Sequence, residues 1–310
     1  MTNSIRRNIS NPRYLASVFV KRGLAWLPDS IFLRLRFYME NGHRLDLSSP
    51  RTFQEKLQWL KLHRRRPEFT TMVDKYAVKD FVASKIGRQY VIPTLGVWNR
   101  ADDIDFDSLP DRFVLKTTHS GGNLGVLVCQ DKASFDKTSA RARLETSLKS
   151  SIYKECREWP YKDVPRRIIA EEFISEPGKP DLTDYKIFCF NGHPHYIQVI
   201  QDRNSHESVD FFDTSWNHQN FCGLNHVVKP VEEPILYPSA KPIERPSGLE
   251  KMLELAAVLA AGTEFVRVDF YNAGDRVYFG ELTFFPNSGY GTFTPSEWNE
   301  RFGDMIELQR

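Results

Sequence analysis

The chain has 310 residues, of which 41% are hydrophobic and 26% are charged, a composition typical of a globular protein large enough for two packed lobes. Its 42 basic and 40 acidic residues leave a formal net charge of +2, so the overall charge does not indicate nucleic acid as a partner. Four scattered cysteines form no CxxC pair, which argues against a zinc site and a disulfide framework.

The sequence shows no segment for export or for crossing a membrane. No apolar run approaches the roughly 18 residues that a transmembrane helix needs, and the first residues lack a signal-peptide cleavage pattern. We therefore expect a protein of the reducing cytoplasm.

Residues 1–70 are predicted to form a basic, helical N-terminal region. Apolar residues recur at helical spacing among basic ones: Leu15, Val18, Phe19, Leu24, Trp26, Ile31, Leu33, Leu35 and Phe37 among Arg13, Lys21, Arg22, Arg34 and Arg36. Two interpretations of this pattern are open. The apolar stripe packs on the core, or residues 12–40 form a surface for a membrane or for a partner in glycan assembly.

From residue 71 the pattern alternates between helix and strand. The expected elements are a helix from Asp74, an extended segment at 91–93, strands at 113–116 and 126–129, a helix at 135–150 and a strand at 167–174. The turn-rich segment 175–180 is the candidate hinge. We therefore predict one lobe over residues 71–179 and a second over residues 180–310.

The second lobe is expected to consist mainly of hairpins. Strands at 185–190 and 195–201 flank Asn191-Gly192, the strongest short hairpin signal. A proline-rich stretch at 229–246 is expected on the surface, and an apolar helix at 248–261 leads into two more strands, at 265–271 and 277–284.

The loop from Lys116 to Gly125 joins two predicted strands and is rich in small and polar residues. Within it Ser120, Gly121, Gly122 and Asn123 supply amide and hydroxyl donors, and the glycines permit close approach to an anion. The loop therefore fits a phosphate cradle, although it lacks the GxxxxGK[ST] pattern of a Walker loop. A plain turn between strands remains the alternative.

Acidic residues also end one predicted strand and begin another. Glu171 and Glu172 close the strand before the hinge, where carboxylates could accept hydrogen bonds from an adenine amino group or from ribose. Asp184 and Lys186 share a face of the next strand, so one could meet ribose and the other phosphate. A solvated strand end and a structural salt bridge are the competing interpretations.

Charged residues occupy the last predicted hairpin, where strands rarely carry them. Arg267 and Asp269 share one face of the first strand, and Glu281 and Thr283 share one face of the second. If Tyr271 pairs with Val277, the two faces coincide. Buried charge must be compensated, either by a divalent metal with a phosphate substrate or by a structural ion pair with Arg267, and both interpretations are open.

The order of these motifs, more than any one of them, resembles the TupA-like branch of the ATP-grasp superfamily. That branch is associated with teichuronopeptide and other bacterial cell-surface polysaccharides. The resemblance covers roughly residues 45 to 305 and is carried by DKYAVKDFV (74–82), LPDRFVLKTTHSGGN (109–123), DYKIFCFNG (184–192) and VRVDFYNAGDRVYFGELTFFPNSG (266–289).

The resemblance implies an α+β ATP-grasp fold in which two α+β lobes clamp ATP and Mg²⁺ behind a short helical N-terminal region. The implied roles are phosphate contacts by Lys75, Lys116 and Lys186, closure of the loop 120–123 over the phosphates, an adenine edge at Glu171 and Glu172, a ribose contact at Asp184, catalysis by Arg267 and Lys116, and magnesium ligands at Asp269 and Glu281. Many relatives place Asn where this chain has Thr283, with Asn287 further along, so the third ligand is either Thr283 or a water.

The implied function is an ATP-dependent ligase that joins a carboxylate to an amine through an acylphosphate. The substrates would be a uronic acid or an amino acid and an amine acceptor, and the product an amide on a bacterial surface polysaccharide or its precursor, formed in the cytoplasm or at the inner face of the membrane. The alternatives are an ATP-grasp kinase acting on a glycan hydroxyl, a glycosyltransferase using a nucleotide sugar, and a non-catalytic scaffold.

Overall fold

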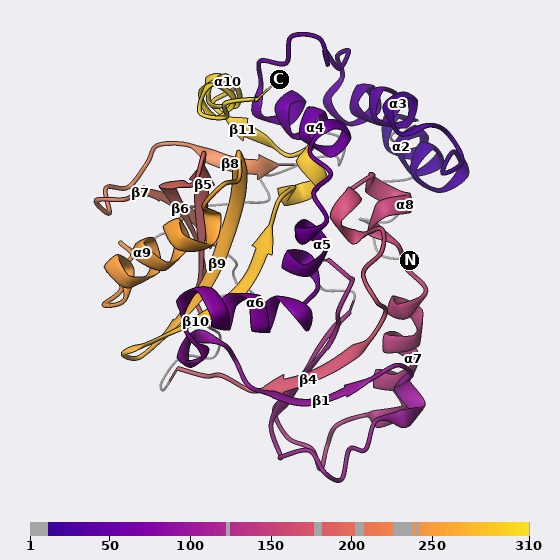
Figure 1. The fold of residues 1–310 in the computed structure, drawn as a ribbon, viewed down its shortest axis with the longest axis vertical. Helices are drawn as coiled ribbons and strands as arrows, with labels where there is room; N and C mark the ends of the chain where they lie inside the picture. Colours follow the sequence, from indigo (N-terminus) through magenta and orange to yellow (C-terminus); the bar gives the residue numbers. More distant parts are fainter. Residues whose placement is uncertain are drawn as a thin grey trace.

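The computed structural model describes residues 12–121, 125–176, 182–201, 208–225, 238–239 and 242–309. Its helices are α2 (Pro12–Gly23), α3 (Asp29–Asn41), α4 (Phe53–His63), α5 (Glu68–Val73), α6 (Ala77–Ile86), α7 (Lys137–Leu148), α8 (Ile152–Cys156), α9 (Leu249–Ala260) and α10 (Glu297–Asp304). Figure 1 shows them around two antiparallel sheets that form the two lobes of the molecule.

The smaller sheet has the strand order β1-β4-β2-β3. Its strands are β1 (Thr94–Trp98), β2 (Phe113–Thr117), β3 (Val126–Cys129) and β4 (Ile168–Glu172). Helix α7 packs on β2 and contributes Ala140 and Leu144 to a core that also contains Phe113 and Leu115. This lobe therefore has a hydrophobic core of its own.

The larger sheet has the order β10-β9-β5-β6-β7, and a short two-stranded sheet pairs β11 with β8. The strands are β5 (Asp184–Phe190), β6 (His193–Gln201), β7 (Ser208–Asp213), β8 (Cys222–Asn225), β9 (Phe265–Ala273), β10 (Arg276–Thr283) and β11 (Thr292–Thr294). Helix α9 packs on β5, β6 and β9. Because side chains alternate along a strand, one face of β9 points into this core.

The expected hairpin at Asn191-Gly192 is present. Both residues have positive φ, 48° and 84°, as a tight primed turn requires. By contrast, the sequence does not predict β1, β7, β8 or β11 as strands. Strand β8 is only four residues long, and Gly223 within it lies against the rings of Phe293 and Phe211, so its position depends on tertiary packing rather than on a local alternating pattern.

Residues 53–82 pack on the larger sheet rather than forming a separate N-terminal layer. The ring of Phe53, which is fully buried, lies 5.0 Å from Phe265 and 5.8 Å from Phe302, measured between ring centroids. Leu57, Leu60 and the apolar residues of α5 and α6 belong to the same core. The predicted division at residues 70 and 71 stays a prediction, and it does not coincide with a break in this core.

Helices α2 and α3 pack on each other and project from the body of the molecule (Figure 1). Phe32, Leu33 and Phe37 of α3 form a small buried cluster with Tyr290. The guanidinium of Arg36 lies 4.6 Å from the centre of the Tyr290 ring, a cation–π contact. The N-terminal helices are thus attached to the segment that follows β10.

Replacing Phe53 by alanine should lower the free energy of unfolding by about 3–5 kcal/mol, because a fully buried ring leaves a cavity among other rings. The matched control is Phe19→Ala on α2, where the side chain is 63% exposed and the change should stay within about 0.5 kcal/mol. Urea unfolding of both variants measures this. Equal losses would contradict the packing described for α4.

Candidate active site

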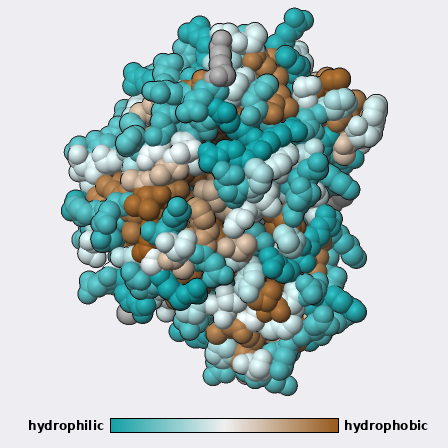
Figure 2. Space-filling model, viewed as in Figure 1, coloured by the Kyte–Doolittle hydropathy of each residue, from teal (hydrophilic) through white to brown (hydrophobic). Residues whose placement is uncertain are grey.

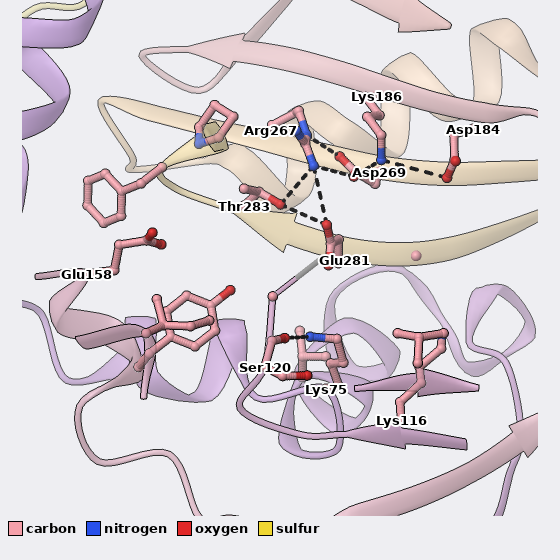
Figure 3. Close-up of a pocket in the computed structure, with 18 of the residues that line it drawn as sticks. Lys75, Lys116, Ser120, Glu158, Asp184, Lys186, Arg267, Asp269, Glu281 and Thr283 are labelled. Atoms are coloured by element: carbon pink, nitrogen blue, oxygen red, sulfur yellow. Dashed lines mark hydrogen bonds and ion pairs between the residues drawn. The ribbon is translucent and has the colours of Figure 1, made fainter. Parts of the chain in front are cut away.

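A cavity of about 800 Å³ lies between the two sheets and is lined from both lobes. Figure 3 shows its polar centre, where Lys75, Lys116 and Ser120 on one wall face Arg267, Asp269 and Glu281 on the other. A volume of this size is within the range of small-molecule sites.

On the wall formed by the smaller sheet, one carboxylate binds two lysines. The Glu171 side chain, on β4, accepts from Lys116 Nζ of β2 at 2.5 Å and from Lys79 Nζ of α6 at 2.6 Å. Burial alone would raise the pKa of Glu171, but the two ammonium groups hold this pKa below its ordinary value. Lys79 Nζ also donates to the carbonyl of Ile92 at 2.5 Å.

The beginning of the predicted phosphate loop is tied to the start of α6. The Lys75 amide donates to the Thr118 carbonyl at 3.1 Å, and the Lys75 ammonium donates to the carbonyl of Ser120. The Thr117 hydroxyl is 2.6 Å from the hydroxyl of Ser120. Ser120 and Gly121 line the cavity, whereas Gly122 and Asn123 lie outside the described residues.

A β-bulge in the last hairpin determines which side chains reach the cavity. Near the turn Tyr271 pairs with Tyr278, so the pairing with Val277, which was the condition for the two faces to coincide, is not formed. Continued unchanged, the observed register would place Glu281 on the face opposite to Asp269. The register instead shifts between Phe279 and Glu281, at Gly280, and Glu281 then pairs with Asp269.

The shifted register creates one connected group of polar side chains. Arg267 donates to both carboxylate oxygens of Asp269 at 2.7 Å, a bidentate pair. The Nη2 atom of Arg267 also lies 3.1 Å from the Thr283 hydroxyl and 3.3 Å from Glu281 Oε1. Figure 3 shows these contacts bridging the two strands. The ion pair expected as one interpretation of the hairpin is therefore present.

Lys186 of β5 extends this group toward Asp184. Its Nζ atom lies 2.5 Å from Asp269 Oδ2 and 3.7 Å from Asp184 Oδ1. All three side chains are at least nine-tenths buried and line the cavity. The salt bridge between Asp184 and Lys186 that the sequence left open is therefore also present.

Glu281 is the carboxylate of this group most accessible to a ligand, since its side chain is 40% exposed. Burial would raise its pKa, but Lys75, Lys186 and Arg267 lower the pKa to about 2. Burial also lowers the pKa of Lys75, and Glu281 opposes that shift. Glu281 and Lys75 come from opposite walls, so this attraction acts across the cavity.

The donor set fits a magnesium ion held partly by a substrate. Among the described residues no group of three or more His, Cys, Asp and Glu side chains could hold a metal, so a cage made only of such ligands is not formed there. Asp269, Glu281 and the Thr283 hydroxyl nevertheless face one cavity together. Magnesium commonly uses one or two carboxylates, with phosphates and waters completing its shell.

Of the described residues proposed from the sequence as site residues, Glu172 alone does not line the cavity. Successive side chains of a strand point to opposite faces, so with Glu171 directed into the cavity Glu172 is exposed. Its backbone amide donates to the Pro93 carbonyl at 3.1 Å. The roles of the other site residues remain predictions, but the structure brings their side chains together.

Two further features of the cavity were missed. Lys79 follows Lys75 by four residues, so the helix predicted from Asp74 would have placed both on one face, although in the structure Lys75 precedes α6. The other is the end of the cavity near Glu158, a buried carboxylate that accepts from the Ser288 hydroxyl at 2.7 Å. Glu158 lies between a short helix and a 3₁₀ turn, where no periodic pattern marks it.

Comparison with known proteins shows the family of the chain. The model of the TupA-like ATP-grasp family matches residues 55–307. The chain belongs to this family. The predicted family and the α+β ATP-grasp fold behind N-terminal helices are thus confirmed. No curated protein matches the chain.

Several solved structures are similar to the TupA-like chain at low identity. D-alanine–D-alanine ligase from Bacillus anthracis has 18% identity and a TM-score of 0.42, over 76% of this chain and 66% of that one. The D-alanine–D-alanine ligase from Helicobacter pylori has 16% identity and a TM-score of 0.42, over 82% of this chain and 69% of that one. ATP-grasp ligase PsnB, complexed with a minimal precursor, Mg and ADP, has 11% identity and a TM-score of 0.36, over 74% of this chain and 57% of that one. The chain thus spans less than two thirds of the Bacillus anthracis ligase.

Replacing Glu281 by glutamine should destabilise the protein at neutral pH by about 1 kcal/mol, since a partly exposed carboxylate loses three cationic neighbours. Because the folded-state pKa is depressed, this stability is present above the ordinary pKa near 4.5 and disappears as pH falls toward about 2. Urea unfolding at a series of pH values measures the difference. The control is Glu244→Gln, an exposed carboxylate outside the cavity. If the loss of stability in the Glu281 variant did not become smaller at acidic pH, the stabilisation by its cationic neighbours would be contradicted.

Proposed function

We propose that this protein is an ATP-dependent carboxylate–amine ligase that works through an acylphosphate. The observation that carries the proposal is the convergence of Lys116 from the smaller lobe and Lys75 from the segment before α6 with Lys186, Arg267 and Glu281 from the larger lobe around a single cavity. Cations on both walls suit a polyphosphate, and carboxylates among them suit the magnesium that accompanies it.

The nucleotide base would occupy the apolar part of the cavity. Val91 and Phe279, both in the hydrophobic core of the larger lobe, form an isolated β-bridge and line the cavity with Ile92. Ile92 lies beside Glu171, since Lys79 Nζ contacts both the Ile92 carbonyl and the Glu171 carboxylate. Glu171 would accept from the adenine amino group, and Asp184 would accept from ribose. The phosphates would then extend toward Lys75, Lys116 and Lys186.

The first step of the proposed reaction transfers a phosphoryl group. A carboxylate oxygen of the substrate attacks the γ-phosphorus, the bond to the β-phosphate oxygen breaks, and ADP leaves with an acylphosphate remaining. Lys116 and Arg267 would stabilise the charge on the transferring group. Asp269 and Glu281, with Thr283, would hold Mg²⁺, whose positive charge would neutralise the phosphate oxygens.

The second substrate would bind beyond Arg267. Figure 3 shows Glu158 on the side of Arg267 and Thr283 that faces away from Asp184 and Lys186. At this end Lys21 Nζ pairs with Glu155 at 2.6 Å, and both line the cavity. A cation at the rim suits an acidic sugar or an amino acid carboxylate, and the two glutamates suit an amine.

The second step would form the amide. The amine nitrogen attacks the acyl carbon, inorganic phosphate leaves, and the nitrogen releases a proton. Burial raises the pKa of Glu158 while Lys61 opposes the shift, which brings this carboxylate closer to the range of a general base. We assign the proton to Glu158. The polysaccharide nature of the substrate, its uronic acid or amino acid, and a cytoplasmic location are part of the same proposal.

The test of the function is a product assay. Purified protein with MgATP, capsular uronic acids and a panel of amino acids should yield ADP, free phosphate and a product with the mass of an amide. A phosphorylated glycan without free phosphate would replace the ligase by a kinase. Thermal-shift screening of ATP against UDP-sugars distinguishes a glycosyltransferase, since only that class should prefer the nucleotide sugar.

Replacing Arg267 by alanine should reduce carboxylate-dependent phosphate release by about 100- to 1,000-fold, because a cation directed at the transferring group is lost. Stabilisation by MgATP in a thermal shift should persist, since Lys75, Lys116 and Lys186 remain. The control is Arg276→Ala, an exposed arginine on the same hairpin that does not line the cavity. Unchanged turnover in the Arg267 variant would rule out the assigned role.

Replacing Glu158 by glutamine should slow amide formation with an amino acid by about 100-fold or more, because the proton acceptor is lost. Hydroxamate formation with hydroxylamine, which attacks as a neutral nucleophile at pH 7, should be nearly unchanged. Mass spectrometry measures both products. Glu244→Gln, an exposed carboxylate that does not line the cavity, is the control and should leave both products unchanged. Equal loss with both nucleophiles would instead assign Glu158 a structural role.

A further inference from the structure

The outer face of α2 and α3 carries large apolar side chains in contact with solvent. Its members and their exposed fractions are Leu15 46%, Phe19 63%, Trp26 76%, Ile31 47%, Leu35 38% and Tyr38 50%. We call these six residues the outer face. Of the ten exposed large hydrophobic residues among those described, six belong to it. Figure 2 shows hydrophobic residues gathered over α2 and α3.

The outer face follows helical spacing and is separate from the face that packs on the body. Leu15 and Phe19 are four residues apart on α2, and Ile31, Leu35 and Tyr38 follow the i, i+4, i+7 positions on α3. The opposite side of α3 buries Phe32, Leu33 and Phe37. Helix α3 is therefore apolar on two sides, and only one of them is covered by the protein.

Exposed charge on this part of the surface is mainly basic. Between residues 12 and 46 the described side chains that are exposed and charged are four arginines and one carboxylate: Arg13, Arg22, Arg34, Arg44 and Asp46. Asp46 lies near Arg34, which donates to the carbonyl of Leu45 at 3.1 Å. The other two acidic residues of this stretch are only partly exposed and are paired. Asp29 contacts Arg65 and Arg157, and Glu40 accepts from the Ser17 hydroxyl.

We propose that the outer face binds the surface of an anionic lipid bilayer. Exposed apolar residues bordered by arginines match the acyl boundary and the phosphate headgroups, and amphipathic surfaces of this composition bind membranes in that way. Trp26, in the turn between the helices, is suited to the headgroup region. None of the described helices is long and apolar enough to cross a membrane, so the contact would lie in the interface.

A second copy of the chain fits this face less well. In a two-fold dimer each outer face would meet its own copy. The exposed charges around it are four arginines against one carboxylate, Asp46, so two basic surfaces would approach each other. Like charges across an interface are unfavourable. A bilayer with anionic lipids supplies the compensating charge, which is why we choose it as the occupant.

The outer face adjoins the cavity through α2. Lys21 lies on α2 on the side away from Phe19, since residues two apart do not share a helix face, and it lines the end of the cavity where the acceptor is proposed to bind. A membrane-bound protein would therefore hold this end of the cavity one helix diameter, roughly 10 Å, from the outer face, where a lipid-linked acceptor could reach it. Membrane binding itself does not depend on the ligase assignment and is tested without substrate.

Co-sedimentation of the full chain with vesicles tests the proposal. The protein should bind phosphatidylcholine vesicles that contain phosphatidylglycerol, and bind vesicles of pure phosphatidylcholine much more weakly. Phe19→Ser and Trp26→Ser should each weaken binding about tenfold or more, since each removes a large apolar side chain from the interface. Arg22→Glu and Arg34→Glu should each weaken it about fivefold or more, and added salt should weaken the wild type.

Matched controls lie on the smaller lobe and on α9. Val128→Ser and Val258→Ser change exposed apolar residues, 51% and 43% exposed, outside the outer face, and Arg143→Glu reverses an exposed charge on α7. These variants should bind vesicles as the wild type does. Absent binding to anionic vesicles, or equal losses in test and control variants, would overturn the proposal. So would a dimer in analytical ultracentrifugation that Phe19→Ser and Trp26→Ser convert to monomer.

Discussion

The candidate site depends on the compensation of buried charge within an antiparallel sheet. Arg267, Asp269 and Lys186 lie on adjacent strands β9 and β5, and each is about nine-tenths buried or more. Charges in such a place are tolerated only with close partners. The bidentate contact between Arg267 and Asp269 and the 2.5 Å contact from Lys186 supply them. The sheet can therefore present charge to the cavity and still be the wall of a hydrophobic core.

On the opposite wall of the cavity buried charges are also compensated by close partners, although the cations there are two lysines. There one carboxylate, Glu171, lies between two lysines, whereas on the larger sheet Asp269 lies between an arginine and a lysine. In both places a carboxylate keeps two cations apart. A phosphate chain entering between the walls can replace those carboxylates as the partner of the cations, so binding would exchange ion pairs rather than create them.

Much of the fold and of the candidate site could be predicted from the sequence. Glycine, proline and the Asn191-Gly192 turn mark the ends of elements, and the charged residues of β2, β4, β5, β9 and β10 identified most of the cavity wall. The sequence could not give the register of the last hairpin, because a bulge at Gly280 depends on how the two strands pair. Nor could it place Glu158, whose burial results from contacts between segments more than a hundred residues apart, such as Ser288.

The bulge at Gly280 restricts how this hairpin can change length. Side chains alternate between the two faces of a strand, so the register between β9 and β10 determines whether Glu281 and Thr283 point to the cavity or to the core. One extra residue within the paired part of β10 alone would turn both side chains away from the cavity. One extra residue in each strand, or extra residues in the turn at Gly274, would leave both side chains facing the cavity. Among relatives, insertions in this hairpin should therefore be confined to its turn, and the paired strands should lengthen together.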